Sequence, residues 1–572
     1  SYTTGYNAGK SEASGYDDQK APAADASQAE KDAYEGAQAG AKDAIAGNPT
    51  PTDLATKSPA YQTAYKQAHD AAATGLTDGQ NNTTPTDAQK ADPAYVKGNN
   101  AAQSAKEATE DAQAGNTDHQ AKTADPDAYT NAAKAYADGA TAAAAGKTDP
   151  STSTDPIYKA AYNQAINDTA AARQAAIKDA SDRHDQDVDP TKSYSANPTV
   201  QAAAKQAYAD AQKALTDTLA GNAPTNPNDA QTAGTAAANN DKSYVADTIA
   251  GKTPSATVSD DSAQTIKAQV AAAQAAVAAN PDASDELNSK DPLANYAYKQ
   301  AFDDAKAKYD NGVANAAKAQ ATDSSADAAT KQGADDFSKG LTAAVNGQTI
   351  ANPTSGEKAG IDAAKSFNQG YTDGEKGTDD SNVTDPVQKA AAAAAKEALT
   401  DYANGSPKGT DDINKMDPVS KAAYQKALDD AKGLATQGQN AFTNGTGRPD
   451  DSTPAGKVAA AAYDKAKQGY EDAAAGKTTD ADKNDPAYQA GQKAYTDSQT
   501  GYNGTTTPAD NASQLTKDAY NGATSGAADA VAGKAKPADL ATKSQAYQDA
   551  YNKAYDQAQK GMADATAGTQ PT

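Results

Sequence analysis

The chain of 572 residues contains no cysteine and no tryptophan, and it has only 2 methionines and 4 phenylalanines. Without cysteine, no disulfide framework, zinc finger or thiol nucleophile can form. Leu, Ile, Val and Phe together fall well below the ~20% that marks possible disorder when net charge is high. Side chains this small cannot build a thick core or a concave apolar pocket. We therefore expect no globular catalytic domain.

Positive charge is also scarce. Lys and Arg total 52 against 76 Asp and Glu, which gives a net charge of −24 and a pI of about 4.5. Because no basic patch is available to neutralise phosphates, nucleic acid is not expected as a partner. Anionic membrane surfaces are disfavoured for the same reason. No run of about 18 apolar residues occurs, so we also expect no membrane insertion.

The chain is instead rich in alanine, and it carries 29 tyrosines. Alanine is the best helix former, and it lets helices approach each other closely. In the segment 58–79, Tyr61, Ala64, Tyr65 and Ala68 follow helical i, i+3, i+4 spacing. We expect such tyrosines to pack between helices, with the hydroxyl reaching water at the edge of the contact. A sugar-binding aromatic surface is the less favoured alternative.

Helix starts are marked by a capping residue followed by proline. Asp or Ser accepts hydrogen bonds from free backbone N–H groups, and proline fits the first helical position. The signal occurs at Ser58, Asp92, Asp125, Asp155, Asp291, Asp385, Asp417 and Asp485, with less regular members at Asn197, Asn226, Asn352 and Ser452. Helix ends are expected at glycines, which adopt the left-handed conformation readily. These are Gly47, Gly79, Gly115, Gly146, Gly221, Gly251, Gly312, Gly347, Gly377, Gly405, Gly445, Gly476, Gly504, Gly533 and Gly568.

These signals define helix-plus-loop units of about 30 residues. We predict an all-α fold: an elongated tandem array of roughly 17 short helices, forming a rod or a superhelical solenoid. Loops of roughly 8–12 residues are expected to let consecutive helices reverse and pack antiparallel.

A longer repeat is superimposed on the units. Leu54 aligns with Leu540, an offset of 486 residues, and KDAYEGAQAGAKDAIAG at 31–47 matches KDAYNGATSGAADAVAG at 517–533. The offset holds without gaps over residues 1–86 and 487–572. We interpret 1–486 as one super-repeat of about sixteen units and 487–572 as the start of the next. The chain is therefore expected to be a piece of a longer protein with several such blocks.

No catalytic, cofactor-binding or metal-binding residue is predicted. The three histidines, His69, His119 and His184, have no second histidine nearby in the sequence, and we interpret them as solvated helix or loop residues. The acidic segment Asp182–Pro190 is faintly like a calcium loop. Counted from Asp185, the positions that need Gly and Glu hold Pro190 and Ala196, so a solvated linker is favoured.

The DPAY-type helix starts and the AGN or AGK helix ends, in an acidic and cysteine-free chain, resemble a known class of sequence. They are similar to the Ala-rich repetitive stalks of giant cell-surface proteins of Gram-positive bacteria, particularly lactic acid bacteria. This resemblance covers the whole chain through its composition. It implies a helical stalk that projects an adhesive tip or forms fibrils.

We therefore expect a non-enzymatic stalk or fibril, extracellular or attached to the cell wall, that serves attachment between cells or to a host. Its partners would be other copies of itself, side by side or end to end, or ligands on the host or cell surface. No cofactor is expected. Two alternatives stay open: a helical solenoid that binds carbohydrate or protein, and a largely disordered acidic spacer.

Overall fold

The computed structural model describes residues 1–17, 20–116, 123–182, 192–477 and 482–569. Within these ranges the chain forms helices and loops and contains no strand, which confirms the predicted all-α fold. The chain divides into two units. The first comprises Ser1–Ala272 and Asp285–Ala301, and the second comprises Ala273–Ser284 and Phe302–Thr572.

Eighteen of the described helices have 16 to 27 residues, close to the predicted number of units. In the first unit these are α1 (Tyr2–Asp17), α2 (Gln28–Ala46), α3 (Pro59–Gln80), α5 (Pro93–Ala114), α6 (Pro126–Ala144), α7 (Pro156–Asp182), α8 (Pro198–Leu219) and α9 (Asp229–Ile249). Two helices, α10 (Asp260–Ala279) and α11 (Pro292–Ala317), run from one unit into the other.

The second unit continues with further long helices and their connections. These long helices, eight in all, are α12 (Ala328–Val345), α13 (Ser355–Lys376), α14 (Pro386–Ala403), α16 (Pro418–Thr443), α17 (Pro454–Ala474), α18 (Pro486–Tyr502), α19 (Gln514–Val531) and α20 (Gln545–Thr566). Short turns of helix lie in the loops: α4 (Asp87–Ala91), α15 (Thr410–Asn414), η1 (Leu54–Thr56) and η3 (Leu540–Thr542).

The predicted helix starts are largely confirmed. The side chains of Ser58, Asp92 and Asp485, for example, accept hydrogen bonds from the first backbone N–H groups of their helices, and proline follows each of them. Asn226 and Asn352 are exceptions. Both adopt positive φ in the preceding loop, and the caps are Asn228 and Thr354 two residues later. At the start of α17 the cap is Thr453, one residue after the predicted Ser452.

The predicted helix ends are correct at twelve glycines, which have positive φ. They are wrong at Gly79 and Gly312, because α3 and α11 continue past these positions. At Gly312 a side chain would lie 2.0 Å from the backbone oxygen of Thr330. Glycine is needed there because another helix backbone lies against it, and this requirement looks the same in the sequence as a helix stop.

The prediction that consecutive helices pack antiparallel is wrong, because they run parallel. Gly36 and Gly40 of α2 lie against the backbone of Tyr61 and Tyr65 of α3, so both contacts advance in the same direction along the two helices. The same holds at Gly370 and Gly374 of α13, which face Gln388 and Ala392 of α14. In each pair the later glycine faces the later residue of the neighbouring helix.

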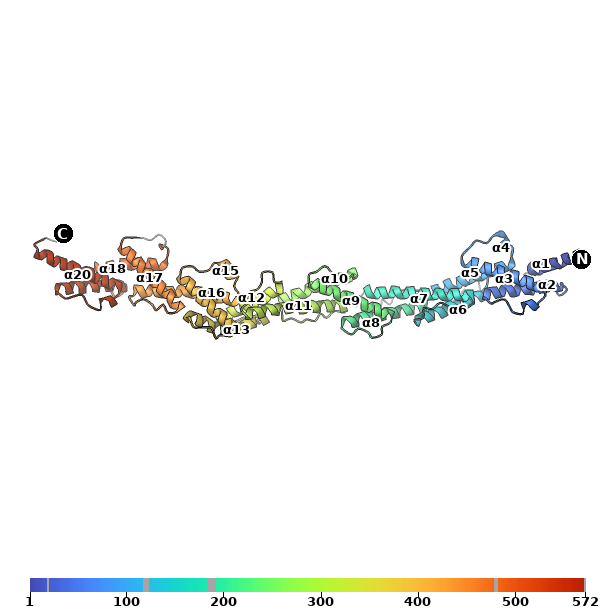
Figure 1. The fold of residues 1–572 in the computed structure, drawn as a ribbon, viewed down its shortest axis with the longest axis horizontal. Helices are drawn as coiled ribbons and strands as arrows, with labels where there is room; N and C mark the ends of the chain where they lie inside the picture. The colour runs from blue at the N-terminus through green and yellow to red at the C-terminus, as the bar shows by residue number, and fades with distance from the viewer. Residues whose placement is uncertain (18–19, 117–122, 183–191, 478–481, 570–572) are drawn as a thin grey trace. The chain divides into compact units, whose positions relative to one another are not determined.

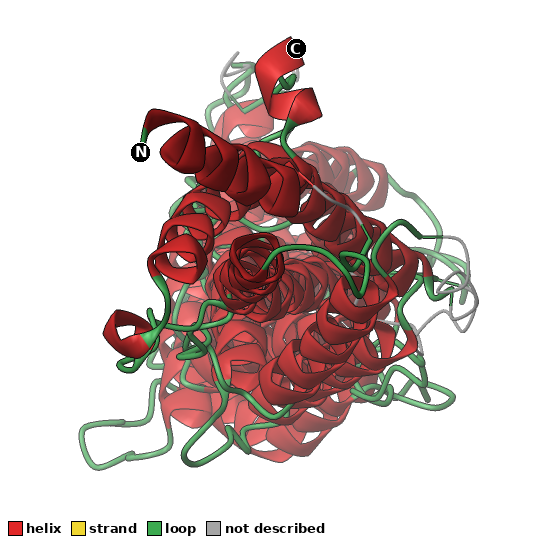
Figure 2. Cartoon of the chain, turned by 90° about the vertical axis from the view of Figure 1, so that its right-hand side faces the viewer, coloured by secondary structure: helices red, strands yellow, loops and turns green. Residues whose placement is uncertain are grey.

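The connecting loops are long enough to permit this parallel arrangement. The loop between α2 and α3 spans residues 47–58 and could extend to about 40 Å. It has to run back along only about two thirds of α2, because a helix rises about 1.5 Å per residue and α3 begins farther along the axis than α2. The loops lie on the outside of the helices (Figures 1 and 2).

Successive parallel helices are displaced along their axes. The caps Ser27 and Ser58 are 31 positions apart, but Gly36 lies level with Tyr61, only 25 positions later. The difference of six residues means that α3 begins about 9 Å farther along than α2. Between α13 and α14 the same comparison gives about 20 Å. Within each unit, helices are therefore added lengthwise.

Helices that are three or four positions apart in the series of long helices meet end to end. Gly47, at the end of α2, lies against Thr154 and Pro156 at the start of α7. In the second unit, Gly377 at the end of α13 lies against Pro454, the first residue of α17. Each helix also packs on its nearest neighbours in the chain. The helices of a unit thus wind around a shared axis, three or four per turn.

Candidate functional site

The tyrosines supply most of the large side chains buried between helices. Eight of the twelve largest fully buried side chains are tyrosines. Their burial confirms the prediction that tyrosine packs between helices. The hydroxyl groups, however, were expected to reach water, and many donate hydrogen bonds to aspartates of another helix instead. These pairs include Tyr65–Asp43, Tyr95–Asp78, Tyr129–Asp111, Tyr158–Asp138, Tyr424–Asp401, Tyr488–Asp472 and Tyr551–Asp529.

A recurring group of three residues forms these contacts. In α2, Gly40 lies against the backbone oxygen of Tyr65, and Asp43, one turn later, accepts the Tyr65 hydroxyl at 2.8 Å. We call this arrangement the Gly–Asp–Tyr contact. The missing glycine side chain lets the two backbones approach, and the carboxylate then lies within reach of the phenol. Further examples are Gly75–Asp78–Tyr95, Gly469–Asp472–Tyr488 and Gly526–Asp529–Tyr551.

Several contacts recur in the two sequence copies offset by 486 residues. The bond from Tyr551 to Asp529 is 2.9 Å long, close to the 2.8 Å from Tyr65 to Asp43. The ammonium group of Lys31 donates to the Ala24 carbonyl in the first copy. Lys517 donates to the equivalent Asp510 carbonyl in the second copy. The super-repeat boundary at 486/487 stays a sequence prediction.

The environment of these tyrosines stabilises the neutral phenol. Burial, followed by the bond to Asp78, raises the pKa of Tyr95 to about 12. For Tyr158 the hydrogen bond to Asp138 is the largest cause, and its pKa is also raised to about 12. A catalytic tyrosine acting as a base near neutral pH would need its pKa lowered. These groups therefore serve as hydrogen-bond donors.

The histidines form no site in the part of the chain that the structure describes. His69 lies on α3, half-buried, with its ring stacked on Tyr65 at 6.0 Å and its Nδ1 3.6 Å from Asp70. His119, His184 and most of the acidic segment Asp182–Pro190 lie outside the described residues. Among the described residues, no group of three His, Asp or Glu side chains is placed to hold a metal ion.

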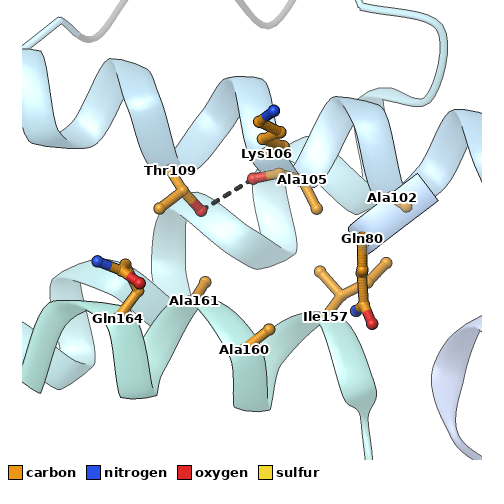
Figure 3. Close-up of a pocket in the computed structure, with 9 residues that line it drawn as sticks. All are labelled: Gln80, Ala102, Ala105, Lys106, Thr109, Ile157, Ala160, Ala161 and Gln164. Carbon is orange, nitrogen blue, oxygen red and sulfur yellow. Dashed lines mark hydrogen bonds between the residues drawn. The ribbon is translucent and has the colours of Figure 1, made fainter. Parts of the chain in front are cut away.

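One groove between helices is lined mainly by alanine and glutamine. This groove, of about 310 Å³, lies between α3, α5 and α7 (Figure 3). It is lined by Gln80, Ala102, Ala105, Lys106, Thr109, Ile157, Ala160, Ala161 and Gln164. The Thr109 hydroxyl donates to the Ala105 carbonyl of its own helix at 2.9 Å. The Lys106 ammonium group donates to the side-chain oxygen of Asn82 at 2.9 Å. Both the amine and the hydroxyl of this groove are therefore already engaged in hydrogen bonds.

A second groove in the first unit is larger and has more charged side chains in its lining. It has a volume of about 700 Å³, and its lining includes Lys42, Lys97, Asp127, Asn131 and Asp155. Asn131 already donates to Asp155 at 2.7 Å. Tyrosine is not among the lining residues, so a sugar would find hydrogen-bonding groups here but no aromatic surface on which to stack.

No helix in the described ranges combines the length and apolar character that a membrane span requires. Comparison with known proteins places the chain in no family: no family model, curated protein or solved structure matches it.

Proposed function

We propose that the chain is a non-enzymatic stalk or fibril segment of a very long secreted or cell-surface repeat protein. Such a stalk would hold an adhesive region away from the cell for attachment to other cells or to a host. The observation that carries the proposal is the lengthwise displacement of parallel helices, by about 9 Å to about 20 Å per helix. Each added helix increases length, and the end-to-end contacts join successive turns of the array.

The chemistry of the chain agrees with this function. Its buried tyrosines and close glycines are used in contacts between helices, so the unusual residues are accounted for by packing. The absence of cysteine makes the fold independent of the redox state outside the cell. The net charge of −24 favours solubility and keeps neighbouring stalks apart. Location at the cell surface or in the cell wall is part of the proposal.

The two alternatives have less support. A ligand-binding solenoid would present tyrosine and asparagine outward at each unit, whereas the described tyrosines that are strongly exposed, Tyr2 and Tyr6, both lie on α1. A largely disordered spacer does not agree with eighteen long helices that bury alanine and tyrosine against each other. Circular dichroism at 20 °C tests the latter directly, since low helicity would favour the spacer.

Small-angle scattering of the 572-residue chain tests the stalk. A compact protein of this length has a radius of gyration of about 25 Å. We expect a value well above that and a cross-section of only a few helices. Antibody labelling of intact producing cells tests location. A compact particle, or labelling only after the cells are opened, would contradict the proposed function.

A further inference from the structure

The buried faces of α2 and α3 both repeat every four residues. On α2 the buried or partly buried set is Ala33, Gly36, Ala37, Gly40, Ala41 and Ala44, and on α3 it is Ala60, Tyr61, Ala64, Tyr65 and Ala68. Four residues are close to one helical turn, so residues at this spacing lie one above the other. Moving α3 by one turn along α2 therefore brings residues of the same kind to the same places.

Two glycines and one hydrogen bond set the observed register. Gly36 lies against the backbone oxygen of Tyr61, and Gly40 lies against that of Tyr65. The Tyr65 hydroxyl donates to Asp43, three residues after Gly40, at 2.8 Å. If α3 moves one turn farther along α2, Tyr61 lies against Gly40 and its hydroxyl takes the place of Tyr65 beside Asp43. We call the observed arrangement the first register and the displaced one the second register.

Tyr61 has the environment that this exchange requires. Its ring stacks on that of Tyr65, with the ring centroids 6.4 Å apart. Burial raises the pKa of the Tyr61 hydroxyl, and the charge of Asp43 contributes, so the group stays protonated as a donor. Within the described residues this hydroxyl makes no hydrogen bond. A free donor therefore lies one turn from an acceptor that Tyr65 now occupies.

The second sequence copy contains the same set of residues. In α19, Gly522 and Gly526 lie against Tyr547 and Tyr551 of α20, and Asp529 accepts the Tyr551 hydroxyl at 2.9 Å. Tyr547 stacks on Tyr551 at 6.2 Å, and its hydroxyl likewise makes no hydrogen bond to residues that the structure describes. The arrangement thus occurs once in each unit.

We propose that the contact between α2 and α3 has two registers, and that in the second register α3 lies four residues, about 6 Å, farther along α2 with Tyr61 bound to Asp43. The change lengthens the array, because α3 already begins about 9 Å beyond the start of α2. Such a contact extends under tension without unfolding a helix. This role under tension rests on the proposed function, in which the stalk carries load along its length.

The connection between the two helices permits the shift. In the first register, residues 47–58 run back about 21 Å from the end of α2 to the start of α3. In the second register the same residues run back only about 15 Å. The loop therefore becomes slacker as the contact lengthens.

Three features keep the unloaded chain in the first register. Ala44 would lie against the Tyr65 backbone in the second register, and its methyl group leaves less room than glycine. As α3 moves with α5 and α7, Gly47 would leave the start of α7, and Gln38 would lose the bond from Lys97 of α5. Tension along the array acts against these contacts, because it draws α2 and α3 apart lengthwise.

The test moves the glycines by one turn. In the Gly36→Ala, Ala44→Gly variant, the two glycines of the contact lie at positions 40 and 44. A methyl group at position 36 would lie 2.4 Å from the Tyr61 backbone oxygen in the first register, so the variant favours the second. The matched control is Gly36→Ala, Ala39→Gly, which has the same composition but places the new glycine in the lining of the groove of about 700 Å³.

Spin labels measure the register directly. The chain has no cysteine, so labels can be attached through Gln28→Cys on α2 and Thr77→Cys on α3, two exposed positions. These positions lie about 36 Å apart along the axis in the first register and about 42 Å apart in the second. Double electron–electron resonance should give the shorter distance for the unchanged contact and for the control. Gly36→Ala, Ala44→Gly should give a distance about 6 Å longer, with unchanged helix content by circular dichroism.

The two tyrosines should also exchange their effects on stability. In the unchanged chain, Tyr61→Phe should leave hydrogen exchange of α2 and α3 unaltered, whereas Tyr65→Phe should lower protection about tenfold. In the Gly36→Ala, Ala44→Gly background, Tyr61→Phe should lower protection about tenfold and Tyr65→Phe should have little effect. A glycine-shifted variant that keeps the shorter label distance and still depends on Tyr65 would overturn the second register.

Tension is tested with fluorophores at the same two labelled positions while the chain is held by its ends. Energy transfer should fall reversibly, by the amount that about 6 Å of lengthening gives, at forces below those that unfold a helix. Constant energy transfer up to the unfolding force would overturn the role under tension. A compact chain in scattering would reject the stalk and leave the register result standing, because the spin-label measurement applies no load.

Discussion

The hydroxyl of Tyr65 on α3 donates a 2.8 Å hydrogen bond to the carboxylate of Asp43 on α2, beside the point where Gly40 brings the two helix backbones together. The bond combines a buried donor with a half-exposed acceptor. Because the arrangement recurs along both units, its strength bears on the stability of the whole array.

Removing the Tyr65 hydroxyl should destabilise α2 and α3 locally. We expect Tyr65→Phe to cost about 1–2 kcal/mol, the range for a bond to a charged group that is partly solvated. Asp43→Ala should cost at least as much, because the buried hydroxyl then loses its acceptor. The double variant should cost less than the sum. Hydrogen exchange of α2 and α3 is the suitable measurement, since repeat arrays can open locally.

The exposed Tyr6, whose side chain is 62% accessible, supplies the control. Tyr6→Phe should change stability by less than about 0.5 kcal/mol. Tyr551→Phe, in the second copy of the sequence, should reproduce the Tyr65→Phe loss in α19 and α20. Additive effects of Asp43→Ala and Tyr65→Phe would show that the bond contributes no coupling between the helices.

Two glycine-to-alanine substitutions should change the stability of the fold in opposite directions. At Gly40 a new methyl group would lie 2.2 Å from the backbone oxygen of Tyr65, so the helices must separate. We expect a loss of about 1–3 kcal/mol, typical of overpacking. At Gly433 nothing lies within 4 Å, and alanine should stabilise the helix by up to about 1 kcal/mol. Thermal unfolding followed by circular dichroism measures both, and equal shifts would contradict the close approach.

The sequence predicts the helices better than their directions. Capping at Asp92 and Asp485 follows from local chemistry, because the side chain bonds to its own helix. The direction of packing depends on which residues of two helices lie level, and this is determined by contacts such as Gly36 with Tyr61. Helix periodicity alone carries no information about this register.

The sequence predicts the tyrosine–aspartate hydrogen bonds only in part. A spacing such as Gly40 to Asp43 recurs in the sequence, but aspartate is so common that the pattern has little specificity. Caps without proline were also missed. Thr354 and Glu357 form a capping box, a recognisable sequence signal that does not depend on proline.

Alkaline pH should unfold the array through its tyrosines. In the folded chain the pKa of Tyr95 and of Tyr158 is raised to about 12, compared with about 10 in an unfolded chain. The folded state therefore holds these protons more tightly. The stabilising contribution of these two protonated tyrosines is complete below about pH 10, and it is lost as pH rises from about 10 through about 12.

Thermal unfolding temperatures should therefore be level near neutral pH and fall steeply above about pH 10. Tyrosinate absorbance should appear together with loss of helix. Lysines lose their charge in the same pH range, so a Tyr95→Phe, Tyr158→Phe double variant is the control, and it should show a shallower pH dependence. A double variant whose unfolding temperature falls as steeply with pH as that of the unchanged chain would contradict the prediction.

Asn197 connects two helices end to end. Substitutions at this position can distinguish its capping bonds from its bond to the other helix. Its side-chain oxygen accepts from the N–H groups of Thr199 and Val200 at the start of α8, at 3.0 Å and 3.1 Å. Its amide nitrogen donates to the Ala112 carbonyl near the end of α5, at 2.8 Å. The residue therefore satisfies free groups on both helix ends.

Asn197→Asp keeps the cap on α8 but replaces the donor with a negative charge beside the carbonyl end of α5, where the helix dipole disfavours it. We expect Asn197→Asp to lower protection from hydrogen exchange in the last turn of α5 while the first turn of α8 stays protected. Asn197→Ala should lower both and cost about 1–2 kcal/mol for the lost cap. If Asn197→Asp left the end of α5 as protected as in the unchanged chain, the end-to-end bond would make no contribution to joining successive turns of the array.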